Sequence, residues 1–312
     1  MMKINRKGLY EPEIAEEKEI GKGTWIDLTA PTGAELKKVA ETLKVPDDIL
    51  RAALDPEERA RVEVEDRIKL VIFKIPMEQK EDNIVTMETI PLGIIILKNN
   101  IITVCLRSNK ILQDFYNKKV KFFATDMRSR FLLQLFARTT RHYINYVNFI
   151  EKNADNIEKK LQKSFKNEYI VKLLELQQSL VYFNYGVTYN GNVLQKILRG
   201  QIIKLLEEDK DFLEDVIIEN SQAIEMTRTS SEVLNNTMEA YSSIISNSLN
   251  TVMKFLTSIT IVLMIPTLVA SIYGMNIDLP LQNDPNAFII TMVASFVFSG
   301  MIALVFWRKQ WF

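Results

Sequence analysis

The sequence has very few of the residues from which disulfide scaffolds and zinc centres are built. Its 312 residues include one cysteine, Cys105, and one histidine, His142. A single cysteine excludes a disulfide within the chain and fits a reducing compartment. A single histidine excludes a metal centre that takes several histidines from one chain. The chemistry of this chain must therefore rest on other residue types.

Net charge and the common catalytic motifs are also absent. Lys and Arg number 39, as do Asp and Glu, so the formal net charge is +0 and gives no reason to expect a nucleic-acid partner. The sequence contains no glycine-rich phosphate loop and no nucleophile elbow. Residues 1–10 lack the apolar core of a signal peptide, so we expect no export by a cleavable signal. An enzyme is the least favoured class.

Two long uncharged apolar runs stand close to the C-terminus. The first covers residues 255–273 and the second residues 287–307, each about long enough to cross a bilayer as a helix. Lys254 precedes the first run, and Arg308 and Lys309 follow the second. Because cytoplasmic flanks are enriched in Lys and Arg, we expect a multi-pass protein of the plasma (inner) membrane with both termini in the cytoplasm.

The first apolar run carries a polar stripe. Polar and thioether side chains recur at alternate spacings of three and four, which places them on one face of a helix. The stripe consists of Asn250, Met253, Thr257, Thr260, Met264, Thr267 and Ser271. A ring of identical helices around a water-filled path would use such a face. Alternatively, two membrane helices would pack closely along it, with hydroxyls bonded across or back to their own backbone.

The same face stays polar before the membrane. Stepping backwards at the same angle gives Ser246, Ser243, Glu239, Asn235 or Asn236, and Glu232, with no lysine. A helix buried against protein would have turned apolar over these turns, so the extension favours a water-filled path. An unbroken helix from about residue 211 into the membrane would be roughly 90 Å long and unstable without neighbours.

The residues that end the first span resemble a known family. Tyr273-Gly274-Met275-Asn276 follows the first of two C-terminal spans and resembles the signature of the CorA magnesium-transporter family. The tripeptide alone is a weak signal, but its place between a long helix and a second span makes it specific. The segment Asn250–Lys254 is also similar to the family's. The resemblance covers the whole chain in organisation and is closest from Glu239 to Asn276.

The resemblance implies an architecture and a partner set. We expect an α/β N-terminal cytoplasmic domain, a long helical stalk and two C-terminal transmembrane helices, assembled as a funnel-shaped homo-oligomer that the family implies is a pentamer. The expected parts are a cytoplasmic α/β domain (1–125), a long antiparallel helical pair (126–210), a stalk helix (211–273) that enters the membrane at about 255, an outer loop (274–286), a second span (287–307) and a basic tail (308–312). Its partners would be copies of itself, the bilayer and divalent metal ions.

The resemblance also implies a function for the stripe and the motif. It implies channel-like influx of hydrated divalent cations, chiefly Mg²⁺ and also Co²⁺ and Ni²⁺, driven by the membrane potential. Gly274, Met275 and Asn276 would form the selectivity filter, with glycine permitting a tight turn and amides bonding the waters of the ion. Met253, Leu256 and Met264 would narrow the path and gate it by dewetting, while Asn250 and the threonine hydroxyls offer outer-shell contacts.

The loop between the spans departs from the family pattern. It contains Asp278 and Asp284, which would concentrate cations at the mouth, and it has no lysine or arginine. Relatives often carry a Pro-Glu pair here, whereas this chain has Asp284-Pro285.

Two carboxylates outside the membrane are candidates for a regulatory metal. Asp211, Asp215 and Glu219 recur every four residues, which costs a few tenths of a kcal/mol per like-charged pair. Either the face is simply solvated, or a bound cation such as Mg²⁺ offsets the repulsion. Asp48 lies in the first turn of a helix, where the dipole alone favours an acid. The resemblance implies that Asp48 and Asp215 bind a regulatory ion between neighbouring subunits, with Glu239 further down the stalk where relatives often have Asp.

The remaining pattern predicts the cytoplasmic elements. Strands are expected at 25–28, 69–75, 89–97 and 101–106, and helices at 33–43, from Pro46, at 130–163 and at 168–198. Asn99 and Asn100 would make a hairpin turn through left-handed φ. The two longest helices would project from the domain as an antiparallel pair, with Gly186 and Gly191 marking a break or close packing. Arg128, Arg130, Arg138 and Arg141 are expected to form a solvated face.

Two other functions stay open on the sequence alone. A zinc-transporting branch of the same superfamily usually departs from Gly-Met-Asn, so Met275 favours magnesium or cobalt. A membrane-anchored scaffold would not need the polar stripe.

Overall fold

The structure is a computed structural model that describes residues 1–11, 13–65, 67–81, 84–164, 166–200, 202–203, 205–281 and 284–311. The chain forms two units, Met1–Asn236 and Thr237–Phe312. Each unit is described separately below.

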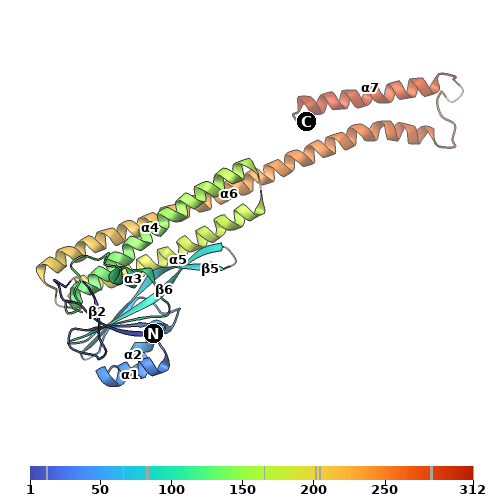
Figure 1. Ribbon diagram of the computed structural model, residues 1–312. Coiled ribbons are helices and arrows are strands. Elements are labelled where there is room, and N and C mark those ends of the chain that lie inside the picture. The colour runs from blue at the N-terminus through green and yellow to red at the C-terminus, as the bar shows by residue number, and fades with distance from the viewer. Residues whose placement is uncertain are drawn as a thin grey trace. The chain divides into compact units, whose positions relative to one another are not determined.

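A seven-stranded mixed sheet lies at the centre of the first unit (Figure 1). Its strands are β1 (Met2–Arg6), β2 (Ala15–Glu16), β3 (Trp25–Thr29), β4 (Arg61–Glu65), β5 (Ile68–Glu81), β6 (Ile84–Ile96) and β7 (Ile101–Cys105), in the order β2-β1-β3-β7-β6-β5-β4. β3 and β7 pair in parallel and all other neighbours are antiparallel.

Both faces of this sheet are buried. Along β5, Leu70 and Ile72 join one apolar cluster with α1 (Gly33–Leu43) and α2 (Asp47–Arg51). Val71 and Phe73 join a second cluster on the other face. Because successive strand residues point to opposite faces, a continuous run of apolar residues fills both layers.

The helices on the second face come from later in the chain. They are α3 (Lys110–Tyr116), α4 (Arg128–Lys163), α5 (Asn167–Leu198) and the first turns of α6 (Glu207–Tyr273). Phe131 and Phe136 of α4, Leu194 of α5 and Leu213 of α6 are all fully buried in this cluster. The sheet therefore separates α1 and α2 from α4, α5 and α6 (Figure 1).

The helix α1 begins where the sequence carries a capping signal. Thr32 Oγ1 accepts from the Glu35 backbone N–H at 3.3 Å, and the Glu35 carboxylate accepts from the Thr32 N–H at 2.8 Å. This second bond is the largest cause that lowers the pKa of Glu35 to about 2. The reciprocal bonds satisfy donors that a helix start leaves free, which explains why the predicted bounds 33–43 are confirmed.

The strands match the sequence prediction in the interior and depart from it at the edges. The strand expected at 25–28 is β3, and the hairpin joins β6 to β7. The hairpin turn was expected to use left-handed φ at Asn99 and Asn100, and this expectation is wrong, because neither residue adopts a positive φ. Asn100 instead donates through Nδ2 to Gly21 O at 2.6 Å and Thr24 Oγ1 at 2.8 Å, which holds the turn against the neighbouring loop.

Several elements were not predicted. These are the edge strands β2 and β4, the strand β1 next to β2, and the short helix α3, while β5 and β6 begin before or end after the predicted 69–75 and 89–97. β4 alternates apolar and charged residues with its charges exposed, so it lacks the apolar run used to find strands.

The helical pair α4 and α5 packs on the sheet instead of projecting from it. The Asn190 side chain bonds both backbone groups of Lys74, at 2.8 and 2.7 Å, and Tyr143 Oη donates to the same carbonyl at 3.1 Å. The Met87 N–H donates to Ser179 Oγ at 3.2 Å. These contacts fix α5 along β5 and β6.

The two glycines of α5 mark close packing and not a break. α5 runs unbroken through both, and a Cβ added at Gly186 would clash with the Tyr143 hydroxyl. At Gly191 it would lie 2.9 Å from Asn220 Nδ2 on α6. The absent side chains let α5 approach α4 and α6 closely.

The second unit contains the C-terminal part of α6 and the helix α7 (Ala287–Arg308), which run antiparallel to each other (Figure 1). Pro266 lies within α6 without ending it. Both helices are long and apolar enough to cross a membrane. Only 6% and 11% of their most apolar windows are buried, unlike the core helices of a soluble protein.

We expect Gly186→Ala to lower the thermal stability of the full-length protein in detergent. The added methyl group must displace the buried Tyr143 ring, and overpacking of this kind costs about 1–3 kcal/mol. Gly33→Ala is the matched control, because nothing lies within 4 Å of a Cβ at that position. Equal melting temperatures for the two variants would contradict close packing at Gly186.

Candidate ion pathway and metal sites

The polar stripe of α6 is uncovered in the single chain. Every side chain predicted to line the path is exposed; these are Asn250, Met253, Leu256, Thr257, Thr260, Met264, Thr267 and Ser271. Met253, Leu256 and Met264 are 59%, 58% and 64% exposed, although they lie in or beside an apolar span. The chain alone therefore offers this face no cover.

A different face of α6 carries the packing. Ser258 is completely buried, and on α7 Ser295 and Ser299 are 3% and 6% exposed. Small residues of this kind let membrane helices approach closely. Ser258 lies next to Thr257 and is therefore rotated by about 100° around the helix. Packing within the chain uses these serines, which the sequence analysis missed, and it leaves the stripe free.

Two hydroxyls of the stripe, those of Thr260 and Thr267, donate their hydrogens to the backbone of their own helix. Thr260 Oγ1 donates to the Leu256 carbonyl at 2.8 Å, and Thr267 Oγ1 donates to the Leu263 carbonyl at 3.1 Å. A hydroxyl that donates to its own helix still presents lone pairs outward. The face therefore offers mainly acceptors, which are the groups that water bound to a cation requires.

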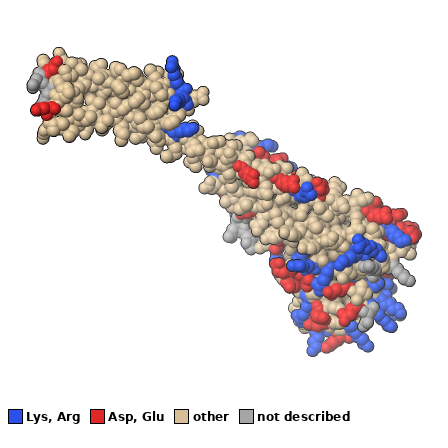
Figure 2. Space-filling view, turned by 180° about the vertical axis from the view of Figure 1, so that it is seen from behind, with Lys and Arg blue, Asp and Glu red and all other residues tan. Residues whose placement is uncertain are grey.

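Charges flank the two spans without entering them. In the upper left of Figure 2, the surface of α7 and the adjoining part of α6 is uncharged along its length, with acidic side chains at one end and basic ones at the other. The sequence identifies the acids as Asp278 and Asp284 and the bases as Lys254, Arg308 and Lys309. This separation matches a pair of spans with its loop on one side and both ends on the other.

The Gly-Met-Asn motif forms the bend directly after α6. Gly274, Met275 and Asn276 are exposed, and the Gly274 N–H donates to the Ala270 carbonyl at 2.9 Å. Gly274 does not adopt a positive φ, and a Cβ there would lie 3.4 Å from its nearest neighbour, the Ala270 carbonyl. The chain does turn at Gly274, and the Met275 N–H donates to the Ile272 carbonyl at 3.2 Å around it, without the left-handed backbone that only glycine adopts readily.

The outer loop folds back on the helix end. Tyr273 Oη donates to the Pro280 carbonyl at 3.2 Å. Asp284 Oδ1 accepts from the Asn286 N–H at 2.8 Å, so this acid has a local structural contact besides its exposed position. Asp278 is exposed as well. Positions 282 and 283 of the predicted loop lie outside the described residues.

One chain does not bring the two regulatory candidates together. Asp48 lies on α2, whose Ile49 and Leu50 pack on one face of the sheet. Asp215 lies on α6, whose Leu213 and Val216 belong to the cluster on the opposite face. Both carboxylates are exposed, and among the described residues no group of three or more His, Cys, Asp or Glu side chains could hold a metal. Glu239 is also exposed.

Several acidic residues lie in the first turns of α6, within residues 207–219, and two of them form ion pairs with arginines of α4. Asp209, 3% exposed, pairs with Arg130 at 3.0 Å, and Glu219 lies 3.8 Å from Arg141. These pairs correct the expectation that the arginines of α4 form only a solvated face. Within the described part of the chain, Asp215 makes no ion pair, which leaves it available to a cation.

Comparison with known proteins decides the family. The model of the family described as CorA-like Mg2+ transporter protein matches residues 21–309. The chain belongs to the CorA family. It is 30% identical over 294 residues to the cobalt/magnesium transport protein CorA of Methanocaldococcus jannaschii, covering 92% of this chain and 90% of that protein. It is 21% identical to the protein of the same name from Thermotoga maritima, over 92% and 83% of the two chains.

Two solved structures share the fold of this chain. The complete structure of the CorA magnesium transporter from M. jannaschii superimposes with a TM-score of 0.85 and 27% identity, over 100% of this chain and 99% of that one. The ZntB cytoplasmic domain of Vibrio parahaemolyticus gives 0.60 at 10% identity, over 80% and 97%, and shows the fold alone. The predicted family, the fold class and the assignment as a transporter instead of an enzyme are confirmed.

Thiol labelling tests which face of α6 meets water. Cys105 is buried, and burial raises the pKa of its thiol to about 11, so the native cysteine should not react. In liposomes, we expect Thr267→Cys to react with a charged methanethiosulfonate at least about tenfold faster than Leu268→Cys, because only a hydrated thiol ionises. Equal rates, or faster labelling at 268, would contradict a water-facing stripe.

Proposed function

We propose that several copies of this chain form a channel-like path that carries hydrated divalent cations across the membrane. Mg²⁺ would be the chief substrate and Co²⁺ would also be carried, in keeping with the names of the CorA relatives. We propose Ni²⁺ as a further substrate. The observation that supports this most directly is the exposed stripe of acceptors along a membrane span, on a face that α7 does not use.

The chemistry of the ion explains the kind of side chain on the stripe. Mg²⁺ holds its waters tightly and loses them reluctantly. Those waters keep their oxygens on the ion and present hydrogens outward. Neutral acceptors such as the Asn250 amide oxygen and the hydroxyls of Thr257, Thr260 and Thr267 can bond these hydrogens without replacing the waters.

The two ends of the path have different roles. Asp278 and Asp284 would raise the cation concentration at the outer mouth, and Asn276 amides from several copies would meet the hydrated ion there. Further in, the exposed thioethers of Met253 and Met264 and the side chain of Leu256 would form the narrow apolar gate. A constriction of this kind closes by losing its water.

The membrane potential supplies the driving force. A dication that crosses 100 mV inward gains about 4.6 kcal/mol, twice the single-charge value. No nucleotide hydrolysis is needed for influx. For this direction of flux, the loop at 274–286 must face the outside of the plasma membrane. All other parts outside the spans must lie on its cytoplasmic side: residues 1–125, the helices of 126–210, the stalk at 211–254 and the tail at 308–312.

The same assembly would be regulated by Mg²⁺ on its cytoplasmic side. Asp48 and Asp215 are both exposed and belong to helices on opposite faces of one sheet. An ion bound to both must therefore bridge two copies of the chain, as the family pattern implies for a pentamer. Internal Mg²⁺ would hold neighbouring copies together and close the path, and Glu239 would add to the negative potential along the stalk.

The amide at the filter is tested by Mg²⁺ influx into proteoliposomes under an inside-negative potential. We expect Asn276→Ala to abolish influx or its selectivity, because the ion loses its outer-shell partner at the mouth. Asn286→Ala makes the same chemical change in the same loop outside the motif and should retain influx. No influx from folded, oligomeric wild type, with Co²⁺, Ni²⁺ and Zn²⁺ also tested, would contradict the proposed transport.

Regulation is tested separately by combining Asp48→Asn with Asp215→Asn. We expect the double variant to keep influx but to need far more internal Mg²⁺ to stop it, by about tenfold or more, because neutral amides bind the ion weakly. The measurement is influx at a series of internal Mg²⁺ concentrations. A half-inhibiting concentration equal to that of wild type would refute regulation at these carboxylates.

A further inference from the structure

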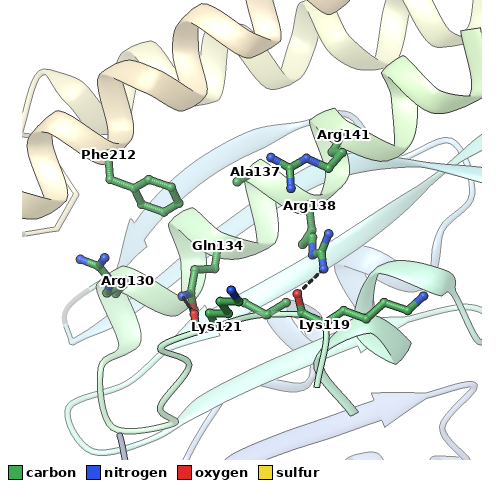
Figure 3. A pocket seen from close by; sticks show the side chains of 9 residues that line it. Lys119, Lys121, Arg130, Gln134, Ala137, Arg138, Arg141 and Phe212 are labelled. Atoms are coloured by element: carbon green, nitrogen blue, oxygen red, sulfur yellow. Dashed lines mark hydrogen bonds between the residues drawn. The ribbon is translucent and has the colours of Figure 1, made fainter. Parts of the chain in front are cut away.

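A cationic pocket in the first unit has no role in the ion path. It is a cavity of about 370 Å³ between the segment before α4, α4 itself and the first turns of α6 (Figure 3). Its lining consists of Lys119, Val120, Lys121, Arg130, Gln134, Ala137, Arg138, Arg141 and Phe212. Its volume lies within the range of about 300–1,000 Å³ that is usual for small-molecule sites.

The lining carries more positive charge than its own partners neutralise. Arg138 and Lys119 share the Asp114 carboxylate, at 3.9 and 3.0 Å, while Arg130 pairs with Asp209 and Arg141 with Glu219. Lys121 makes no ion pair with any described residue. Five cations therefore face three carboxylates, and the remaining positive charge favours an anion.

A buried acceptor in the same pocket lacks a partner. Gln134 is 7% exposed, and its Nε2 donates to the carbonyls of Lys121 and Phe122 at 3.1 and 3.3 Å, which fixes the amide orientation. Its Oε1 is buried with no hydrogen bond among the described residues. An unsatisfied buried acceptor costs about 1–3 kcal/mol, so a ligand that carries a hydroxyl or amino donor would be stabilised here.

The third property of the pocket is an apolar side. Val120, Ala137 and the Phe212 ring complete the lining, and the Arg130 guanidinium lies 5.6 Å from the centre of that ring. An inorganic anion would leave this surface uncovered. A ligand with a ring or another apolar part would bury it and would stack beside Phe212 and the guanidinium plane.

We propose that this pocket binds a small phosphorylated organic molecule of the nucleotide type. Arg138, Arg141 and Lys121 would hold its phosphate groups, Gln134 Oε1 would accept from a hydroxyl or amino group, and Phe212 would contact its ring. Arginine suits this role because its planar fork binds phosphate through paired hydrogen bonds. The pocket is lined by five cationic side chains and has a volume of about 370 Å³, and the chain has a formal net charge of +0, which favours a small molecule over a nucleic-acid strand.

The test is calorimetric titration of the full-length protein in detergent, with EDTA present so that no divalent ion links ligand and protein. The probes are ATP, AMP, inorganic phosphate and adenosine. We expect ATP to bind tightest and AMP more weakly, with inorganic phosphate weaker still and adenosine not binding. Arg141→Glu and Lys121→Glu should each weaken ATP binding by about tenfold or more, since each reverses a charge at the phosphates.

The matched control is Lys152→Glu, which reverses an exposed charge on the same helix about 16 Å further along. It should leave ATP binding unchanged, and the melting temperatures of all three variants should stay at the wild-type value. Absence of ATP and AMP binding would overturn the proposal. The proposal would also fail if Arg141→Glu and Lys121→Glu bound ATP like wild type, or if Lys152→Glu lost as much ATP affinity as these two variants. Binding of phosphate or adenosine as tight as that of ATP would overturn it as well.

Discussion

A polar face on a membrane helix has to be satisfied, and this requirement governs the rest of the structure. Lipid offers no hydrogen bonds, so the acceptors between Asn250 and Ser271 need water, an ion or another protein surface. The chain does not supply that surface, because it buries Ser258 of α6 and Ser295 and Ser299 of α7 and leaves the stripe exposed. A hydrated path shared by several copies of α6 would satisfy these acceptors. It would also explain why the chain has a long helix that continues into the first of two membrane spans, as expected for a member of the CorA family.

The sheet imposes a second constraint, outside the membrane. Both faces of the sheet are buried, with α2 packed on one face and the first turns of α6 on the other, so the sheet and an apolar layer on each face separate the two helices. Carboxylates on these helices cannot share an ion within one chain, and a shared ion has to link two copies. The same packing creates the cationic pocket, where α4 meets the start of α6 and the Arg130–Asp209 pair closes one side. The first turns of α6, the helix that continues into the membrane, therefore carry both Asp215 and Phe212, which lines the cationic pocket.

The sequence predicts most clearly what one helix or one strand decides alone. The helical pattern of residues 33–43 predicts α1, the apolar runs predict β3 and the interior of the sheet, and the spacing of polar residues predicts the exposed stripe. Features that depend on contacts between distant segments were missed. The turn at Asn99 and Asn100 is held by Gly21 and Thr24, and Asp209 is paired with Arg130. For the glycines of α5 the sequence left a break or close packing open, and the neighbouring Tyr143 and Asn220 show close packing.

The central claim is a passive path for a doubly charged ion, and its reversal potential in a planar bilayer tests that claim most directly. A charge of two gains about 4.6 kcal/mol per 100 mV, and a tenfold concentration ratio is worth about 1.4 kcal/mol. The account therefore predicts that the reversal potential moves by about 30 mV for each tenfold change in external Mg²⁺. A shift of about 60 mV, as for one net charge, or a flux that does not reverse, would contradict a passive dication path and would indicate coupled transport.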